Sequence, residues 1–222
     1  MTGRMLSGVE ARTLVAGAGI PFAPWRAADS VEAACAAVAE IGWPVALKTA
    51  APDVAHKSDV GCVALDLGDE VALGAAYARL TANAAAKGST TPDAVLVERM
   101  TEGLAEIALG IKRSETFGPV LMLGLGGIWV ELLQDTSLRL CPITEGEAQE
   151  MLTGLRGAAL LTGGRGRPPC DLDAIAAAAA SLSCLAMDRP DILELDLNPV
   201  LALESGALAV DARVVLAQLE AT

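Results

Sequence analysis

The only histidine of the chain, His56, lies in the polar run DVAHKSDVG at residues 53–61. His56, Lys57 and Ser58 place an imidazole, an ammonium and a hydroxyl at consecutive positions. Imidazole suits the transient carriage of a phosphoryl group, because it is nucleophilic when neutral and leaves readily when protonated. The run is therefore either a loop with His56 as nucleophile and Lys57 and Ser58 near the phosphate, or a solvated polar turn.

A lysine, Lys48, lies near the end of the hydrophobic run PVALKT at residues 44–49. This run predicts a short strand, so the lysine places one ammonium at the rim of a sheet. An ammonium in that position can meet a phosphate oxygen. The alternative is a surface lysine whose alkyl stem lies along apolar residues.

Two glutamates, Glu98 and Glu106, lie eight residues apart on successive predicted strands, at residues 94–100 and 104–112. Carboxylates at the joint between two halves of a protein can accept hydrogen bonds from a ribose or from an adenine amino group. The alternative is two solvated charges at strand ends.

Polar residues also gather near the end of the chain, at Asp196, Asn198 and Asp211. Asp196 and Asn198 alternate with two leucines, so both side chains lie on one face of a strand. Hard oxygen ligands on neighbouring strand ends suit a Mg²⁺ ion that bridges nucleotide phosphates. An Asn-Pro turn would explain Asn198 equally well without a metal.

Two arginines, Arg139 on a strand and Arg165 in the loop TGGRGRPP at residues 162–169, could donate hydrogen bonds to phosphate. The glycines of this loop allow close backbone approach to a ligand, or simply make a flexible surface loop. The loop is not a Walker A motif, because G-x-x-x-x-G-K-[ST] is absent.

Capping boxes at Ser7–Glu10 and Thr144–Glu147, and caps at Ser30 and Asp171, predict where helices begin. The expected helices are residues 7–17, 31–41, 69–87, 144–155, 171–187 and one that begins near residue 212. The expected strands are residues 44–49, 62–67, 94–100, 104–112, 119–125, 128–133, 192–198, 199–203 and 207–211.

This mixture of helices with hairpin-like strands favours an α+β fold over a regular βαβ winding. The least regular joint lies at residues 99–103. We therefore expect two subdomains, an N-terminal one at residues 1–100 and a C-terminal one at residues 101–222.

The composition of the chain excludes some classes of binding partner. The net charge is −12 and no basic stripe offsets it, so nucleic acid is not expected as a partner. No apolar run reaches the roughly 20 residues that span a bilayer, so no membrane partner is expected. The five cysteines are widely spaced without a C-x-x-C pair, which favours reduced thiols in a cytoplasmic protein.

Taken in order, these segments resemble the ATP-grasp domain of the NDP-forming acyl-CoA synthetases. That family includes the β subunit of ADP-forming acetate–CoA ligase and relatives of the succinyl-CoA synthetase β chain. The resemblance extends over residues 7–215. It rests on PVALK (44–48), HKSDVG (56–61), VERM (97–100), EIALG (106–110), FGPVLMLGLGGIWVELL (117–133), GGRGRPP (163–169), LDLNPV (195–200) and VDAR (210–213).

The resemblance implies an ATP-grasp fold in which two subdomains sandwich ATP or ADP. It implies that Lys48 contacts the nucleotide phosphates. Glu98 and the backbone near Met100 would meet the adenine, and Glu106 would meet the ribose.

The resemblance also implies a metal and a carrier. Asn198 and Asp211 look like the Mg²⁺ ligands, with Asp196 near the metal. The histidine of the HKSD segment carries phosphate between a distant active site and ADP in that family, and His56 matches it.

The implied reaction is acyl-CoA + ADP + phosphate ⇌ carboxylic acid + CoA + ATP, through an acyl phosphate and phosphohistidines. Nothing in the chain resembles the CoA-binding and ligase regions, so the resemblance implies a CoA-binding α subunit as a partner in a heteromeric complex. Two other functions stay open, a regulatory ATP-binding module and an ATP-grasp carboxylate–amine ligase.

One position departs from the family pattern. The family has two glycines after the HKSDV stretch, whereas this chain has Gly61 followed by Cys62. A side chain at residue 62 either hinders the approach of the backbone to phosphate or faces the core and changes nothing.

Overall fold

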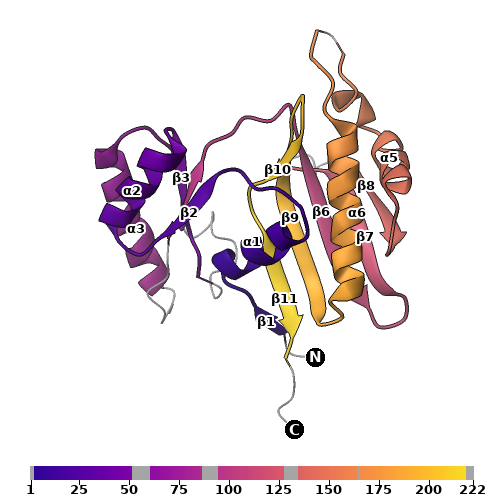
Figure 1. The fold of residues 1–222 in the computed structure, drawn as a ribbon, viewed down its shortest axis with the longest axis horizontal. Helices are drawn as coiled ribbons and strands as arrows, with labels where there is room; N and C mark the ends of the chain where they lie inside the picture. Colours follow the sequence, from indigo (N-terminus) through magenta and orange to yellow (C-terminus); the bar gives the residue numbers. More distant parts are fainter. Residues whose placement is uncertain (1–2, 52–60, 87–94, 128–134, 165, 219–222) are drawn as a thin grey trace. The chain divides into compact units, whose positions relative to one another are not determined.

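The chain forms two compact units in a computed structural model that describes residues 3–51, 61–86, 95–127, 135–164 and 166–218 (Figure 1). The N-terminal unit comprises Ser7–Glu10 and Ala23–Thr101. The C-terminal unit comprises Met1–Leu6, Ala11–Phe22 and Glu102–Thr222. The candidates His56, Lys57, Ser58 and Arg165 lie outside the described residues.

The first residues of the chain follow the C-terminal unit. The strand β1 (Gly3–Met5) pairs with β11 (Arg213–Ala217), and the helix α1 (Gly8–Gly17) contributes Ala11 and Val15 to the C-terminal core. The two units therefore differ from the expected ranges 1–100 and 101–222 within the first 22 residues, while the change at Thr101 lies within the expected joint. The limits of the two functional subdomains stay a prediction.

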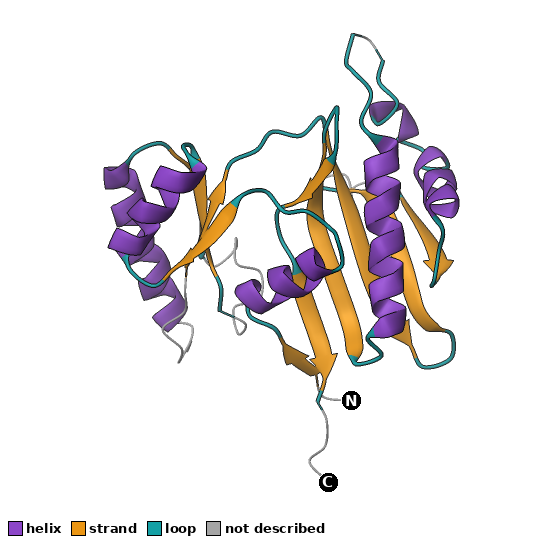
Figure 2. Ribbon diagram, in the orientation of Figure 1, coloured by secondary structure: helices purple, strands orange, loops and turns teal. Residues whose placement is uncertain are grey.

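The N-terminal unit is a four-stranded antiparallel sheet with two helices (Figure 2). Its strands are β2 (Trp25–Ala28), β3 (Val45–Thr49), β4 (Val63–Leu67) and β5 (Val95–Arg99), in the order β2-β5-β3-β4. Its helices are α2 (Val31–Ile41) and α3 (Glu70–Ala86). Every second residue of the central strands, such as Val45, Leu47, Val95 and Val97, packs in one core with both helices.

The helix α2 shows how local sequence defines an element. Ser30 is its N-cap and accepts a hydrogen bond from the Ala33 amide at 3.1 Å. Gly42 ends it with φ +81°, a conformation in which glycine carries no steric cost, and its amide donates to the Val38 carbonyl at 2.8 Å. Both predicted limits of this helix are confirmed.

The C-terminal unit is built on a seven-stranded sheet in the order β1-β11-β9-β6-β7-β8, with β10 also pairing with β9. Its further strands are β6 (Ala105–Ser114), β7 (Gly118–Leu125), β8 (Thr136–Leu140), β9 (Ile192–Ala202) and β10 (Ala207–Ala209). Its further helices are α5 (Glu145–Thr153), the short 3₁₀ turn η1 (Ala158–Leu160) and α6 (Leu172–Asp188).

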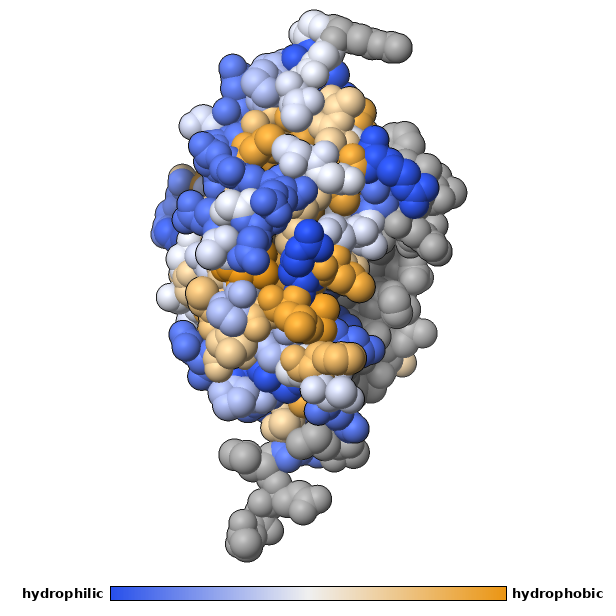
Figure 3. All heavy atoms as spheres, turned by 90° about the vertical axis from the view of Figure 1, so that its right-hand side faces the viewer, coloured by the Kyte–Doolittle hydropathy of each residue, from blue (hydrophilic) through white to orange (hydrophobic). Residues whose placement is uncertain are grey.

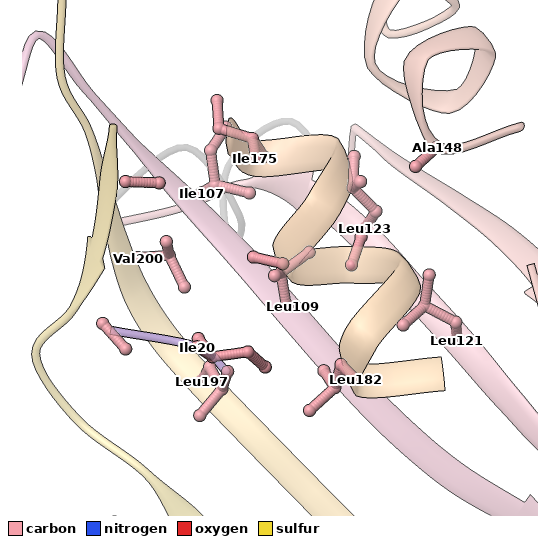
Figure 4. Packing of buried hydrophobic residues seen from close by; sticks show 14 of the residues in the cluster. Ile20, Ile107, Leu109, Leu121, Leu123, Ala148, Ile175, Leu182, Leu197 and Val200 are labelled. Atoms are coloured by element: carbon pink, nitrogen blue, oxygen red, sulfur yellow. The ribbon is translucent and has the colours of Figure 1, made fainter. Parts of the chain in front are cut away.

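One face of this sheet carries the main hydrophobic core. Alternate residues of β6 and β7, among them Leu109 and Leu121, are buried together with Ile175 and Leu182 of α6. Figure 4 shows these side chains gathered beneath the helix, with Leu197 of β9 beside them. The opposite face is left for residues that are not part of this core.

The end of the chain differs from expectation. The prediction of a helix that begins near residue 212 is wrong, because the segment Arg213–Ala217 is the strand β11, which pairs antiparallel with β9. Val214 is fully buried whereas Arg213 is exposed, which is the alternation of a strand with one covered face. The β-branched pair Val214–Val215 favours a strand, and pairing with both β9 and β1 stabilises it.

The two strands expected on either side of Asn198–Pro199 are one continuous strand, β9. The pairing of β9 with β6 shifts at this point, from Leu109↔Leu197 to Ile107↔Val200. Proline has no amide hydrogen to donate to a neighbouring strand, so it is accommodated where the ladder is irregular.

The strand β8 at one end of the sheet carries exposed apolar residues, Leu138 and Leu140, and Phe117 before β7 is also exposed. Figure 3 shows hydrophobic residues gathered near the middle of the face that includes α5 and β8. Within the described residues, every helix is too short or too polar to cross a membrane.

We expect Asp171→Ala to lower the melting temperature of the protein in a pH-dependent way. Asp171 is the N-cap of α6 and accepts hydrogen bonds from the amides of Ala174 at 3.0 Å and Gly206 at 2.8 Å. The bond from Gly206, followed by that from Ala174, holds the pKa of Asp171 below its usual range.

A lowered folded-state pKa gives stability that is present above the unfolded pKa, about 3.9, and that is lost as pH falls through the folded pKa. Thermal unfolding of the wild type, Asp171→Ala and the control Asp188→Ala should be followed from neutral to acid pH. The difference between the wild type and Asp171→Ala should shrink toward acid pH. A difference that stays constant across this range would contradict the role of the ionised carboxylate.

Candidate functional site

The N-terminal unit buries an ion pair between Lys48 and Glu98. The Lys48 Nζ lies 2.9 Å from the Glu98 Oε1, and the two side chains are 10% and 4% exposed. The register of β3 with β5 pairs Ala46 with Glu98 and Lys48 with Leu96, so both charged side chains project from the same face as diagonal neighbours. Lys48 is therefore not a surface lysine.

The placement of this pair follows from strand alternation. The side chains of Leu47 and Val97 fill the core beneath α2 and α3, which turns the intervening Lys48 and Glu98 to the other face of the sheet. Burying either charge alone would be costly, whereas a close pair offsets much of the lost solvation. The result is an ammonium held in a fixed position at the end of a buried strand.

The backbone after β5 is partly committed to the fold. The Arg99 amide donates to the Pro24 carbonyl at 2.8 Å, and the Met100 amide donates to the Pro44 carbonyl at 3.0 Å. The Met100 amide hydrogen is therefore not a group that would be available to a ligand without breaking this bond. An adenine contact from this residue would have to use its carbonyl oxygen.

The structure shows where the side chain of Cys62, the residue that departs from the family pattern, lies. Cys62 is fully buried and packs in a small cluster with Ala51 and Ala84. Its carbonyl accepts a hydrogen bond from the Thr49 amide at 3.1 Å, which continues the pairing of β3 with β4. The side chain therefore faces the core.

The described residue that follows the histidine segment is tied to α3. The Asn83 Nδ2 donates to the Gly61 carbonyl at 2.9 Å. Gly61 has φ +68°, and a Cβ there would lie only 2.8 Å from the Asn83 side-chain nitrogen. This glycine and this asparagine together determine where the chain leaves the segment.

In the C-terminal unit, Glu106 lies on β6 beside a glycine turn. The Gly126 amide donates to the Glu106 carbonyl at 2.7 Å, and a Cβ on Gly126 would lie 3.0 Å from the backbone of Glu106 and Ile107. Gly127 has φ +61°, and a Cβ there would overlap the Glu106 carboxylate. The Gly126-Gly127 pair is thus required by close approach to Glu106, which the sequence alone presented only as a turn.

The three polar residues near the end of the chain come from adjoining segments. Asp196 and Asn198 lie on β9 and alternate with the buried Leu195 and Leu197, as expected. The Val210 amide donates to the Pro199 carbonyl at 3.2 Å, and so joins the segment that follows Asn198 to the one that precedes Asp211. Asp211 accepts a hydrogen bond on Oδ1 from the Ala212 amide at 3.0 Å.

Asp196 has an unusual environment. It lies between Gly110 on β6 and Arg213 on β11 in the two ladders that flank β9. Burial raises the pKa of Asp196, and the neighbouring Asp211 and Glu194 raise it further, whereas Arg213 acts in the opposite direction. The carboxyl group therefore gains a proton more easily than an exposed aspartate does.

The donor set suits magnesium. Among the described residues, no three side chains of the types His, Cys, Asp and Glu come together as a closed metal cage. An amide oxygen from Asn198 and carboxylates from Asp211 and Asp196 are hard ligands, and Mg²⁺ commonly binds one or two carboxylates and keeps water or phosphate oxygens for the rest. These residues fit a Mg²⁺ that accompanies a phosphate ligand.

Arg139 is not brought together with these residues. It pairs with Leu121, whose side chain is buried in the core beneath α6, so Arg139 lies on the helix-covered face of the sheet. Asp196 and Asn198 lie on the other face. The sequence identified the strand of Arg139 but not its register, and a contact of Arg139 with phosphate stays a prediction.

The cysteines carry no sign of catalytic activation. All five are free thiols. Burial raises the pKa of Cys141 to about 11 and also raises the pKa of Cys170. A thiol with a raised pKa is protonated at neutral pH and is a poor nucleophile.

Comparisons with known proteins identify the family of the chain. A family model described as the ATP-grasp domain matches residues 2–216. The chain is 41% identical over 218 residues to acetate–CoA ligase (ADP-forming) I of Archaeoglobus fulgidus, covering 98% of this chain and 32% of that protein. It is 37% identical over 211 residues to the β subunit of acetate–CoA ligase (ADP-forming) I of Pyrococcus furiosus, covering 93% of this chain and 90% of the subunit.

Solved structures show the same fold. PH1788 from Pyrococcus horikoshii superposes with a TM-score of 0.91 at 33% identity, covering 97% of this chain and 93% of that one. A chain of the dinucleotide-forming acetyl-coenzyme A synthetase 1 of Ca. Korarchaeum cryptofilum gives a TM-score of 0.83 at 36% identity, covering 96% and 93%. That structure holds coenzyme A and Mg-AMPPCP, with its phosphohistidine segment pointing toward the nucleotide-binding site.

The chain spans about a third of the Archaeoglobus ligase but nine-tenths of the Pyrococcus β subunit. Its α+β architecture of antiparallel sheets and helices is that of the matching structures. The chain belongs to the ATP-grasp family, in the group that contains the β subunits of ADP-forming acetate–CoA ligases.

Proposed function

We propose that this chain is the nucleotide-binding β subunit of an ADP-forming acyl-CoA ligase, of the acetate–CoA ligase type. In this role it transfers a phosphoryl group between His56 and ADP with the help of Mg²⁺. The observation that carries the proposal is the buried Lys48, whose ammonium is held 2.9 Å from Glu98 at the end of a strand. Similarity to β subunits over most of the chain supports it.

The proposed step exchanges one phosphorus bond for another. A terminal phosphate oxygen of ADP attacks the phosphorus of phosphorylated His56, the P–N bond breaks, and the imidazole leaves as ATP forms. The reverse step phosphorylates His56 from ATP. An imidazole suits both directions, because it is a nucleophile when neutral and a good leaving group when protonated.

Lys48 is proposed to stabilise the phosphates. Its ammonium provides a point charge for phosphate oxygens, and Glu98 keeps that ammonium in place when no phosphate is bound. Glu98 would therefore hold Lys48 in place in addition to making the expected contact with the adenine. The Met100 carbonyl would be the backbone acceptor for the adenine. Lys57, Ser58 and Arg165 remain sequence-based candidates for phosphate contacts.

Glu106 is proposed to accept hydrogen bonds from the ribose hydroxyls. The glycine turn beside it leaves its carboxylate uncovered by side chains on that side, since any Cβ at Gly127 would collide with it. The support for this role is a carboxylate at the beginning of β6 with two glycines packed against it.

Asn198 and Asp211 are proposed to hold Mg²⁺, with Asp196 close to it. When bound, the ion would neutralise charge on the nucleotide phosphates as the phosphoryl group moves. The chain's own contribution is to fix the two ligands relative to each other through the Val210–Pro199 hydrogen bond.

A CoA-binding α subunit is proposed as the partner. The chain matches about a third of the Archaeoglobus ligase, so the remaining two-thirds of such a protein would come from a second polypeptide or an attached domain. The absence of disulfides among the five cysteines supports a reducing, cytoplasmic setting for the complex.

The phosphoryl-carrier role predicts a covalent label on His56. Incubation with γ-labelled ATP and Mg²⁺, with the α subunit present, should give an acid-labile, base-stable label on this chain. His56→Ala should abolish the label, and the surface variant Arg26→Ala should retain it. ATP binding without any label in the wild type would contradict the carrier role and favour a regulatory module. An ADP-releasing reaction with an amine acceptor, unaffected by His56→Ala, would favour a carboxylate–amine ligase.

The buried pair predicts strong coupling between Lys48 and Glu98. Glu98→Gln removes the carboxylate that lies 2.9 Å from the buried Lys48 ammonium, and it should lower the free energy of unfolding by about 3 kcal/mol. The double variant, Lys48→Met with Glu98→Gln, should lose less stability than the sum of the two single changes, because it removes both charges of the pair. Denaturant unfolding of the wild type and the three variants measures this coupling, and purely additive losses would count against the pair.

The metal role predicts an effect on nucleotide affinity that depends on Mg²⁺. Asp211→Asn and Asn198→Ala should each weaken binding of Mg-AMPPCP about tenfold or more, since each removes or weakens an oxygen ligand. Titration calorimetry with Mg²⁺ and again with a chelator measures the difference, with Asp188→Asn as the control. Equal weakening with and without Mg²⁺ would show that these residues do not hold the metal.

A further inference from the structure

An arginine, Arg12, is fully buried on α1 in the C-terminal unit. Its neighbours Ala11 and Val15 on the same helix also have no exposed surface and belong to the hydrophobic core. Placing a guanidinium in such surroundings is unfavourable unless hydrogen bonds and aromatic contacts replace its water. The proposed reaction gives Arg12 no role, so its burial calls for an explanation.

The contacts of Arg12 lead to the loop that carries Asp211. The Arg12 Nη2 donates to the Val210 carbonyl at 2.6 Å. The guanidinium also stacks over the Phe22 ring, with its central carbon 5.1 Å from the ring centroid. A planar guanidinium can stack on a ring and donate in its own plane at the same time, which a lysine ammonium cannot do.

The same loop is held by two further backbone contacts. The Ala209 amide donates to the Pro21 carbonyl at 2.8 Å, and Ala209 forms a bridge with Phe22. The Val210 amide donates to the Pro199 carbonyl at 3.2 Å. Both polar groups of the Val210 backbone are therefore bonded, the amide toward β9 and the carbonyl toward Arg12.

A bonded carbonyl fixes the next residue. The peptide unit is planar, so holding the Val210 oxygen fixes the amide and the Cα of Asp211 as well. The Val210–Pro199 bond holds the same segment against the residue that follows Asn198. Through the Val210 carbonyl, Arg12 thereby acts on the distance between the Asn198 and Asp211 side chains.

We propose that Arg12 is a positioning residue for the Asn198–Asp211 metal site, acting through the Val210 carbonyl and Phe22. The inference rests on the proposed function, which assigns Mg²⁺ to these two residues. Outer contacts that orient metal ligands typically change metal affinity by about 10–100-fold when they are removed. Loss of Arg12 should therefore weaken nucleotide binding in the presence of Mg²⁺ while the protein still folds.

The test uses the variants Arg12→Met and Arg12→Lys with a matched arginine control. Arg113 is also a guanidinium that donates to backbone carbonyls of the C-terminal unit, to Ile192 at 2.9 Å and to Arg189 at 3.2 Å. Arg113→Met removes a comparable clamp at the junction of α6 with β9. Each variant is titrated with AMPPCP in Mg²⁺ and in chelator, and its melting temperature is measured without ligand.

We expect Arg12→Met to weaken binding about tenfold in Mg²⁺ and to leave the affinity in chelator unchanged. Arg12→Lys, which keeps the charge but loses the stacking plane, should recover part of the affinity. Arg113→Met should lower the melting temperature and leave the Mg²⁺-dependent gain intact. Hydrogen exchange without ligand should accelerate at residues 209–212 in Arg12→Met and not in Arg113→Met.

Two results would overturn the inference. One is an unchanged Mg²⁺-dependent gain in Arg12→Met, and the other is an equal loss of affinity with and without metal. If Arg12→Met does not fold, the Arg12→Lys variant decides the question by the same comparison. A wild-type chain that gains no affinity from Mg²⁺ would instead overturn the proposed metal site itself.

Discussion

The period of two along a β-strand is the constraint on which both parts of the candidate site depend. In each unit, helices cover one face of a sheet, and the alternate residues of its strands fill the core beneath them. Leu47 faces that core, so Lys48 must face away from it, and Leu197 does the same for Asn198. The packing that stabilises the fold thereby collects the polar and charged candidate residues on the sheet faces opposite to these helices.

Lys48 and Arg12 both carry a positive charge, and both side chains are buried in this protein. Lys48 is compensated by a carboxylate 2.9 Å away, whereas the Arg12 guanidinium is bonded to a carbonyl and stacked on a ring. Buried charged groups often stabilise a fold no better than apolar residues of similar size. Both lie close to groups assigned here to a nucleotide or its metal, which gives a functional reason for retaining them.

Much of the fold could be predicted from local signals, because caps and alternation act over a few residues. Ser30, Thr144 and Asp171 each begin the predicted helix. The strand β11 was missed because pairing with β9 and β1, distant in sequence, determines its state.

The difference between local and long-range signals also explains which parts of the candidate site could be predicted from the sequence. Lys48, Glu106 and Asp196 could be selected by residue type and position, but the Lys48–Glu98 bond required the register of β3 with β5. Register also placed Arg139 on the face opposite to Asp196, and the close approach of Gly127 to Glu106 and the contacts of Arg12 join residues that are distant in sequence.

The proposed function can be tested by a structure of this chain with Mg²⁺ and AMPPCP bound. We expect the Lys48 ammonium to lie within hydrogen-bonding distance of a phosphate oxygen, and Asn198 and Asp211 both to coordinate the metal. A nucleotide bound elsewhere, with no phosphate oxygen near the Lys48 ammonium and no metal at Asn198 and Asp211, would contradict the proposed function.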